Sequence, residues 1–144
     1  MSIHAIVYFQ RRGLPSSAAW NQALAQLRWN VRFAPGLDVN SASGFQRAIF
    51  YGRRTGAEMY FGDVSAADVA RVGPAAAKTD RQVQFSFSYE LEMAFVLAAS
   101  FALCALAAGI YVDPQAGKIV SQHVLRGEVN SMIARAPRLA GPEW

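Results

Sequence analysis

The two histidines and the single cysteine are the side chains of this chain best suited to acid–base or nucleophilic chemistry. His4 lies in a segment that alternates like a strand, and His123 follows Ser121 where a helix is predicted to begin. Cys104 lies among apolar residues, as a small core residue does. A catalytic dyad needs a nucleophile beside a base, and no spacing here provides one. We therefore expect no catalytic residue, and an enzyme with an unrecognised site is the alternative.

Metal and phosphate chemistry also lack their usual patterns. A structural or catalytic metal needs at least three clustered histidine, cysteine or carboxylate ligands, and no spacing supplies them. The segment Gly52–Gly56 is basic and contains glycine, but it lacks the lysine and the strand-to-helix setting of a phosphate loop. We expect no metal and no cofactor.

The positive charge of the chain comes mainly from arginine. The net charge is +4 over 144 residues, and only Lys78 and Lys118 are lysines. Arginine favours bidentate contacts to carboxylates or phosphates. Apart from the pairs Arg11-Arg12 and Arg53-Arg54, the arginines are scattered, so the pattern does not indicate a nucleic-acid footprint.

Polar, aromatic and arginine side chains alternate with apolar ones along several predicted strands, and tyrosine and arginine are enriched at protein interfaces. If helices cover the apolar face of the sheet, the other face is open to a partner. An ordinary hydrated sheet face is the alternative. The candidate partner-binding residues are Tyr8, Arg47, Tyr51, Arg53, Arg54, Glu58 and Tyr60.

The stretch GFQRAIFY, residues 44–51, begins like the signature of an RNA-recognition motif, a fold that displays aromatic residues on an open sheet. Gln46 and Arg47 then occupy positions that the signature gives to small, apolar or aromatic residues. A single-stranded RNA-binding module is therefore an alternative function, and we expect no nucleic-acid partner.

Twenty consecutive residues, Met93 to Val112, carry no charge. We expect a helix to end near Ala108, because Gly109 suits a helix C-cap. The helical part then spans about 24 Å, which is short for a hydrocarbon core of roughly 30 Å. Its flanks carry no lysine or arginine cluster that would set an orientation. The pattern indicates a buried, alanine-rich core helix, and we expect no membrane partner.

The whole pattern predicts an α+β fold: a mostly antiparallel sheet with helices packed on one face. Residues 1–135 form a single domain, and residues 136–144 are expected to be a loosely ordered tail. Strands are expected at residues 45–51 and 57–61, with Gly52–Gly56 as the loop between them. The first residues lack the basic and hydrophobic segments of a signal peptide, so the expected location is the cytoplasm.

Two segments, GRRTGAEMYF (52–61) and AGIYVDPQAG (108–117), together resemble a group of small bacterial α+β proteins. Some members of that group look like immunity proteins encoded beside polymorphic or type VI secretion toxins. The resemblance implies a non-enzymatic protein that binds and neutralises a cognate toxin domain. This chain is basic, so its partner is expected to present an acidic or neutral surface rather than that of a basic nuclease.

Overall fold

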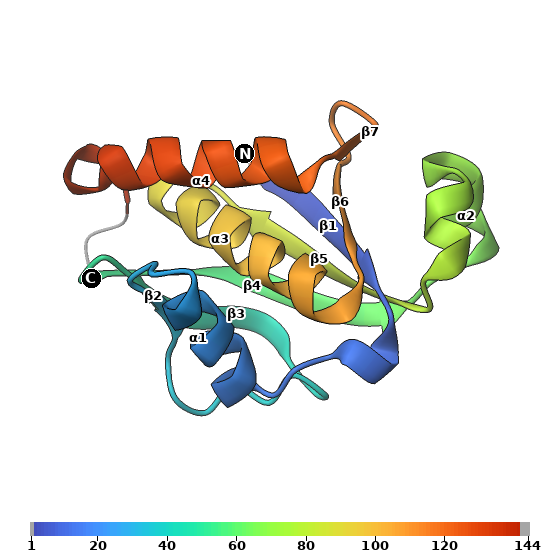
Figure 1. The fold of residues 1–144 in the computed structure, drawn as a ribbon, viewed down its shortest axis with the longest axis horizontal. Coiled ribbons are helices and arrows are strands. Elements are labelled where there is room, and N and C mark those ends of the chain that lie inside the picture. Colours follow the sequence, from blue (N-terminus) through green and yellow to red (C-terminus); the bar gives the residue numbers. More distant parts are fainter. Residues whose placement is uncertain (1, 142–144) are drawn as a thin grey trace.

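The structure, a computed structural model, describes residues 2–141 and confirms the α+β fold (Figure 1). Within these residues, one antiparallel sheet of seven strands is accompanied by four α-helices. The strands are β1 (Ile3–Phe9), β2 (Val31–Phe33), β3 (Ser43–Phe50), β4 (Arg53–Asp63), β5 (Arg81–Phe87), β6 (Ile110–Asp113) and β7 (Lys118–Val120). The helices are α1 (Ser17–Gln26), α2 (Ala66–Val72), α3 (Glu90–Ala107) and α4 (Gln122–Ala134).

The strands lie in the order β2-β3-β4-β5-β1-β6-β7. Register places Val7 of β1 opposite both Val83 of β5 and Tyr111 of β6, and it places Phe85 of β5 opposite Met59 of β4. These side chains are buried on one face of the sheet, which we call the inner face. Helices α1, α3 and α4 cover that face (Figure 1).

Helix α3 lies at the centre of the core. Fourteen of its eighteen residues are buried, because the sheet lies on one side and α1 and α4 pack along its flanks. Trp20 of α1 fixes one flank by donating a hydrogen bond from its indole nitrogen to the carbonyl oxygen of Ala99 at 3.0 Å. Within residues 2–141, α3 is the one helix long and apolar enough to cross a membrane, and 78% of it is buried inside the protein. Its hydrophobicity thus matches that of a core helix, as expected.

The end of α3 differs in detail from the prediction. Ala108, not Gly109, adopts the left-handed conformation that ends the helix, with φ 50° and ψ 46°. Gly109 meets a steric requirement instead. A Cβ atom there would lie 3.0 Å from the carbonyl oxygen of Tyr8 and 3.2 Å from the Cα atom of Cys104. The glycine after this apolar helix therefore reflects close packing and is not the left-handed cap residue.

The loop predicted at Gly52–Gly56 is a shorter turn. Tyr51 and Gly52 alone connect β3 to β4, and both have positive φ angles of 49° and 78°. Two such residues form the hairpin turn whose twist matches that of the flanking strands. Arg53, Arg54 and Thr55 therefore belong to β4, in pairs with β3.

Part of the predicted tail is packed rather than loose. Ala136 and Leu139 are buried, and Arg53 donates hydrogen bonds to their carbonyl oxygens at 3.0 Å and 2.6 Å. The backbone nitrogen of Leu91 also donates a hydrogen bond to the carbonyl oxygen of Ala140 at 2.9 Å. Short polar and proline-rich segments suggest loose order, but the buried side chain of Leu139 anchors this one. Residues 142–144 of the predicted tail lie outside the described residues.

Substituting Ala98 by leucine tests the packing of α3. Ala98 is fully buried, so the larger side chain should reduce the free energy of unfolding by about 1–3 kcal/mol through overpacking. Ala105 of the same helix is exposed, and Ala105→Leu is the matched control, with an expected effect of about 0.5 kcal/mol or less. Chemical denaturation measures both. Equal, small effects of the two substitutions would contradict the close packing of α3.

Candidate binding face

The face of the sheet opposite α3, which we call the outer face, carries the alternate residues of the strands. Glu58 of β4 lies opposite Phe45 of β3 on one side and Ser86 of β5 on the other, and Ser86 lies opposite His4 of β1. Because side chains alternate along each strand, residues opposite one another in the register share a face. Strand pairing therefore places these alternate residues on one face of the sheet, as the alternation in the sequence predicted.

Three arginines surround one apolar residue on the β2–β3–β4 part of the outer face. Ile49 lies opposite Arg32 of β2 and Arg54 of β4, and Arg47 lies two residues before it on β3. All three arginines are exposed, and within residues 2–141 none of their guanidinium groups makes a hydrogen bond or ion pair. A hollow of about 460 Å³ lies among Ala34, Arg47, Ala48, Ile49, Arg54 and Thr55. We call Arg32, Arg47, Ile49 and Arg54 the arginine group.

Glu58 and Tyr60 continue this face along β4. The hydroxyl of Tyr60 donates a hydrogen bond to Glu58 Oε1 at 2.9 Å, and this bond raises the pKa of Tyr60. The side chain of Tyr60 is 43% exposed, as is that of Phe45. Gly56 allows the Phe45 ring to lie close to the strand, because a Cβ atom at Gly56 would be 2.8 Å from Phe45 Cζ.

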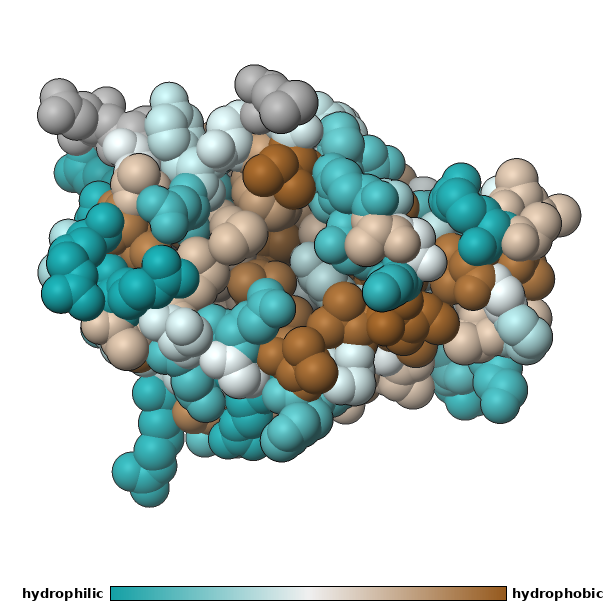
Figure 2. Space-filling model, turned by 90° about the horizontal axis from the view of Figure 1, so that it is seen from above, coloured by the Kyte–Doolittle hydropathy of each residue, from teal (hydrophilic) through white to brown (hydrophobic). Residues whose placement is uncertain are grey.

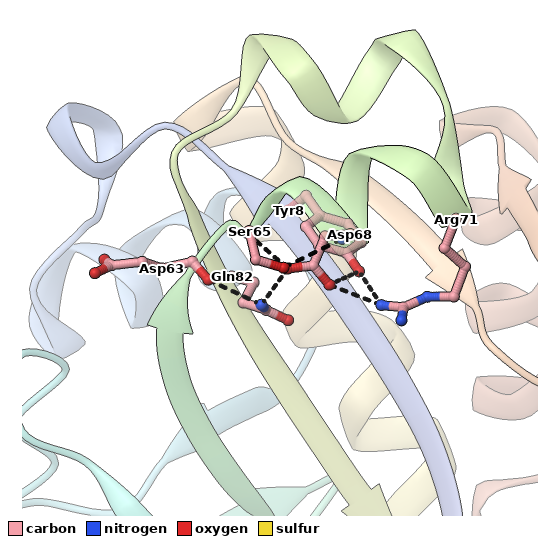
Figure 3. Close-up of polar contacts among 6 residues, drawn as sticks. All are labelled: Tyr8, Asp63, Ser65, Asp68, Arg71 and Gln82. Carbon is pink, nitrogen blue, oxygen red and sulfur yellow. Dashed lines mark hydrogen bonds and ion pairs between the residues drawn. The ribbon is translucent and has the colours of Figure 1, made fainter.

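Helix α2 covers the other end of the outer face, where Tyr8 and Gln82 lie side by side in the register (Figure 3). The Tyr8 hydroxyl donates a hydrogen bond to Asp68 Oδ1 at 3.1 Å, and Arg71 donates to the same carboxylate oxygen at 2.7 Å. Gln82 and the backbone nitrogen of Ser65 donate to Asp68 Oδ2 at 3.0 Å and 2.8 Å. We call these five residues the α2 anchor.

Asp68 is the centre of the α2 anchor. Burial alone would raise its pKa, but the hydrogen bonds from Ser65 and Tyr8 and the charge of Arg71 together hold that pKa below 3.8. Burial raises the pKa of Tyr8. The aspartate is therefore ionised and the tyrosine neutral at neutral pH, so the carboxylate accepts hydrogen bonds that fix α2 on the sheet.

The structure separates the seven predicted partner-binding residues. Arg47, Arg54, Glu58 and Tyr60 lie exposed on the outer face, as predicted. Tyr8 lies on that face but is fully buried under α2, so the expectation that its side chain is open to a partner on that face is wrong. The cause is α2, a short helix whose position on the sheet the alternation could not indicate.

Two further predictions about these residues change. Tyr51 lies in the β3–β4 turn with its ring 5.0 Å from that of Phe50, not in the sheet. Arg53 faces the inner side and holds residues 136–139, so its guanidinium is engaged within the chain. Arg32 and Ile49 join the outer face although the sequence interpretation did not include them. The alternation of β2 and β3 contains this signal, but only the pairing places them beside Arg54.

The candidate catalytic side chains do not assemble into a dyad within residues 2–141. The ring of His4 lies 3.3 Å from Gln84 on the outer face, and His123 is exposed on α4. Cys104 is buried, and burial raises the pKa of its thiol to about 12, so the thiol stays protonated. No group of three or more histidine, cysteine or acidic side chains in this part of the chain could hold a metal ion.

Comparison with protein-family models, curated proteins and solved structures finds no match to this chain. The resemblance to immunity proteins therefore stays a prediction. What the outer face could do follows from its own side chains.

Replacing Asp68 by asparagine tests the α2 anchor. At pH 7 the free energy of unfolding of the variant should be about 1.5–3 kcal/mol lower, because the hydrogen bonds to a buried charge are weakened. The lowered pKa of Asp68 gives stability that is complete above pH 3.8 and is lost as the pH falls through the native pKa. The two proteins should therefore converge in stability in acid.

Asp63→Asn is the matched control for this substitution. Asp63 forms ion pairs with Arg11 and Arg81, but its side chain is 72% exposed, so the loss should be about 1 kcal/mol or less. Denaturation curves between pH 2 and 7 measure both variants. An Asp68→Asn loss that stays constant down to pH 2 would contradict the role of the ionised carboxylate.

Proposed function

We propose that this chain is a non-enzymatic protein that binds an acidic surface of a protein partner through the arginine group. The observation that carries the proposal is the set of three exposed arginines around Ile49, without hydrogen-bond or ion-pair partners in the described part of the chain. Guanidinium groups form bidentate hydrogen bonds with carboxylates, and an apolar residue between them gives area that becomes dry on binding.

A protein partner fits this face better than an RNA. Glu58 lies on the same face and would repel a phosphate backbone, whereas its carboxylate and the Tyr60 hydroxyl can pair with protein side chains. The three arginines of the group also lie at the β2–β3–β4 end of the sheet, whereas Arg71 at the α2 end is paired with Asp68. Single-stranded RNA binding is the competing function that the experiment below separates.

The partner we propose is a cognate bacterial toxin domain with an acidic contact surface. This choice rests on the resemblance of residues 52–61 and 108–117 to proteins that look like immunity proteins. An immunity protein acts by occlusion and needs no catalytic residue, in keeping with the role proposed here. We accordingly propose that it works in the cytoplasm, where it would meet the toxin.

Reversing two charges of the arginine group tests this function. The double variant Arg47→Glu/Arg54→Glu should bind a toxin domain encoded by the neighbouring gene at least about tenfold more weakly and protect coexpressing cells less well. Calorimetry with the purified domain and cell survival are the two measurements. The control Arg28→Glu/Arg138→Glu makes the same change in charge at exposed sites off the outer face and should stay within about twofold.

Two results would overturn the proposal. One is a neighbouring toxin domain that kills cells equally with and without the wild-type protein. The other is salt-sensitive binding of wild-type protein to single-stranded oligouridine that the arginine reversals abolish, which would establish the RNA function instead. Thermal denaturation of both double variants confirms that a lost interaction is not lost folding.

A further inference from the structure

A second hollow opens on the opposite side of the sheet from the arginine group. It has a volume of about 300 Å³ and lies between α3, α4 and the strands β1, β5, β6 and β7. Phe87, Leu97 and Leu125 are among the apolar residues of its wall. Figure 2 looks down on this side of the molecule and shows apolar side chains gathered in the middle of the face. We call this hollow the α4 cavity.

The geometry of α4 produces this space. Leu125, Val129 and Met132 of α4 are buried and form its contact with the core, while the β6–β7 hairpin lies beside α4 at the edge of the sheet (Figure 1). Helix and hairpin flank the space without filling it. A volume of about 300 Å³ is at the lower end of the range of ligand pockets, so an occupant would be a small molecule.

One side chain of the cavity wall carries a hydroxyl that no other group of the described residues engages. Tyr111 lines the cavity and is only 7% exposed, yet its hydroxyl makes no hydrogen bond within residues 2–141. Burial raises the pKa of Tyr111, and the charges of Asp113 and Glu128 raise it further. The hydroxyl is therefore neutral and lies in the field of two carboxylates. This hydroxyl is available for a hydrogen bond with a ligand in the cavity.

Two carboxylates beside the Tyr111 hydroxyl indicate the charge of the ligand that the cavity would hold. Asp113 and Glu128 both line the cavity, and no lysine or arginine of residues 2–141 does. Asp113 Oδ1 accepts hydrogen bonds from the backbone nitrogens of Gln115 and Ala116 at 3.0 Å and 3.3 Å, which leaves Oδ2 without a partner in the described part of the chain. Glu128 forms no ion pair there. An anionic ligand would be repelled, whereas a cation would be held by two acids.

We propose that the α4 cavity binds a small primary amine with an apolar body. The apolar body lies against Phe87, Leu97 and Leu125, and the ammonium donates hydrogen bonds to the carboxylates of Asp113 and Glu128 and to the hydroxyl of Tyr111. The ammonium has three donors, which matches the three acceptors that these residues offer. This site is independent of the arginine group, because it lies on the other side of the sheet.

Titration with n-hexylamine, n-hexanol and hexanoate tests the proposal with three probes of similar size and different charge. Binding is followed by NMR through the shifts of backbone amide resonances. The resonances of residues in α4 and in the β6–β7 hairpin should shift. The amine should bind about tenfold more tightly than the alcohol, because its hydrogen bonds are charge-assisted, and hexanoate should bind most weakly.

Two variants test whether Glu128 and Tyr111 bind the ammonium group. Glu128→Gln keeps the shape of the side chain and should weaken hexylamine about tenfold while leaving hexanol within about twofold. Tyr111→Phe removes only the unpartnered hydroxyl and should weaken hexylamine by severalfold. Glu58→Gln is the control on the outer face, where the same loss of charge should leave both affinities unchanged. Melting curves of each variant confirm that the fold is retained.

The proposal is overturned if hexylamine and hexanol bind equally, or if the amine shifts resonances away from α4 and the β6–β7 hairpin. It is also overturned if Glu128→Gln and Glu58→Gln reduce hexylamine binding to the same extent, because a general loss of negative charge would then explain the effect. None of these results bears on the arginine group, which is tested with a protein partner.

Discussion

The structure depends on the burial of α3, a helix that is apolar on nearly all sides. Such a helix cannot lie on a protein surface, so it needs a sheet beneath it and a helix along each flank. The transfer of its side chains from water into the core contributes more to the free energy of folding than that of any other single segment. The placement of the other elements follows from this requirement.

One consequence concerns the two faces of the sheet. Strands β1, β3, β4 and β5 direct their large apolar residues toward α3, so their alternate residues appear on the outer face. Part of that face is covered by α2, which is fixed through the ionised Asp68 and the buried hydroxyl of Tyr8. The remainder, with the arginine group, has no covering element in the described part of the chain. Its side chains are therefore available for contacts outside the domain.

Periodicity in the sequence was sufficient to predict the inner core. The alternation of Val83, Phe85 and Phe87 and the continuous apolar run of α3 each have one simple structural solution, and the structure contains both. Two of the predictions that were wrong, those for Tyr8 and Arg53, involve long-range contacts. Tyr8 is buried by a helix sixty residues away, and Arg53 binds carbonyl oxygens more than eighty residues away. Neither contact has a local signal, since a tyrosine on a polar strand face and an arginine beside a turn look like surface residues.

The candidate site shows the same limit. Arg47 and Arg54 were predicted from their residue types, but their grouping with Arg32 around Ile49 depends on the pairing of three strands, which a single sequence does not specify. The α4 cavity depends on Tyr111, Asp113 and Glu128, which meet only through the packing of α4 beside the β6–β7 hairpin. A sequence indicates which side chains can bind, and the fold decides which of them meet.

Hydrogen–deuterium exchange of the chain with and without the proposed toxin domain tests most directly whether the arginine group is the binding surface. Binding there should slow amide exchange in β2 and the β3–β4 hairpin, residues 31–33 and 43–63, and leave α4 unchanged. Slower exchange confined to α4, to the β6–β7 hairpin or to α1, with β2 and β3–β4 unchanged, would contradict the account.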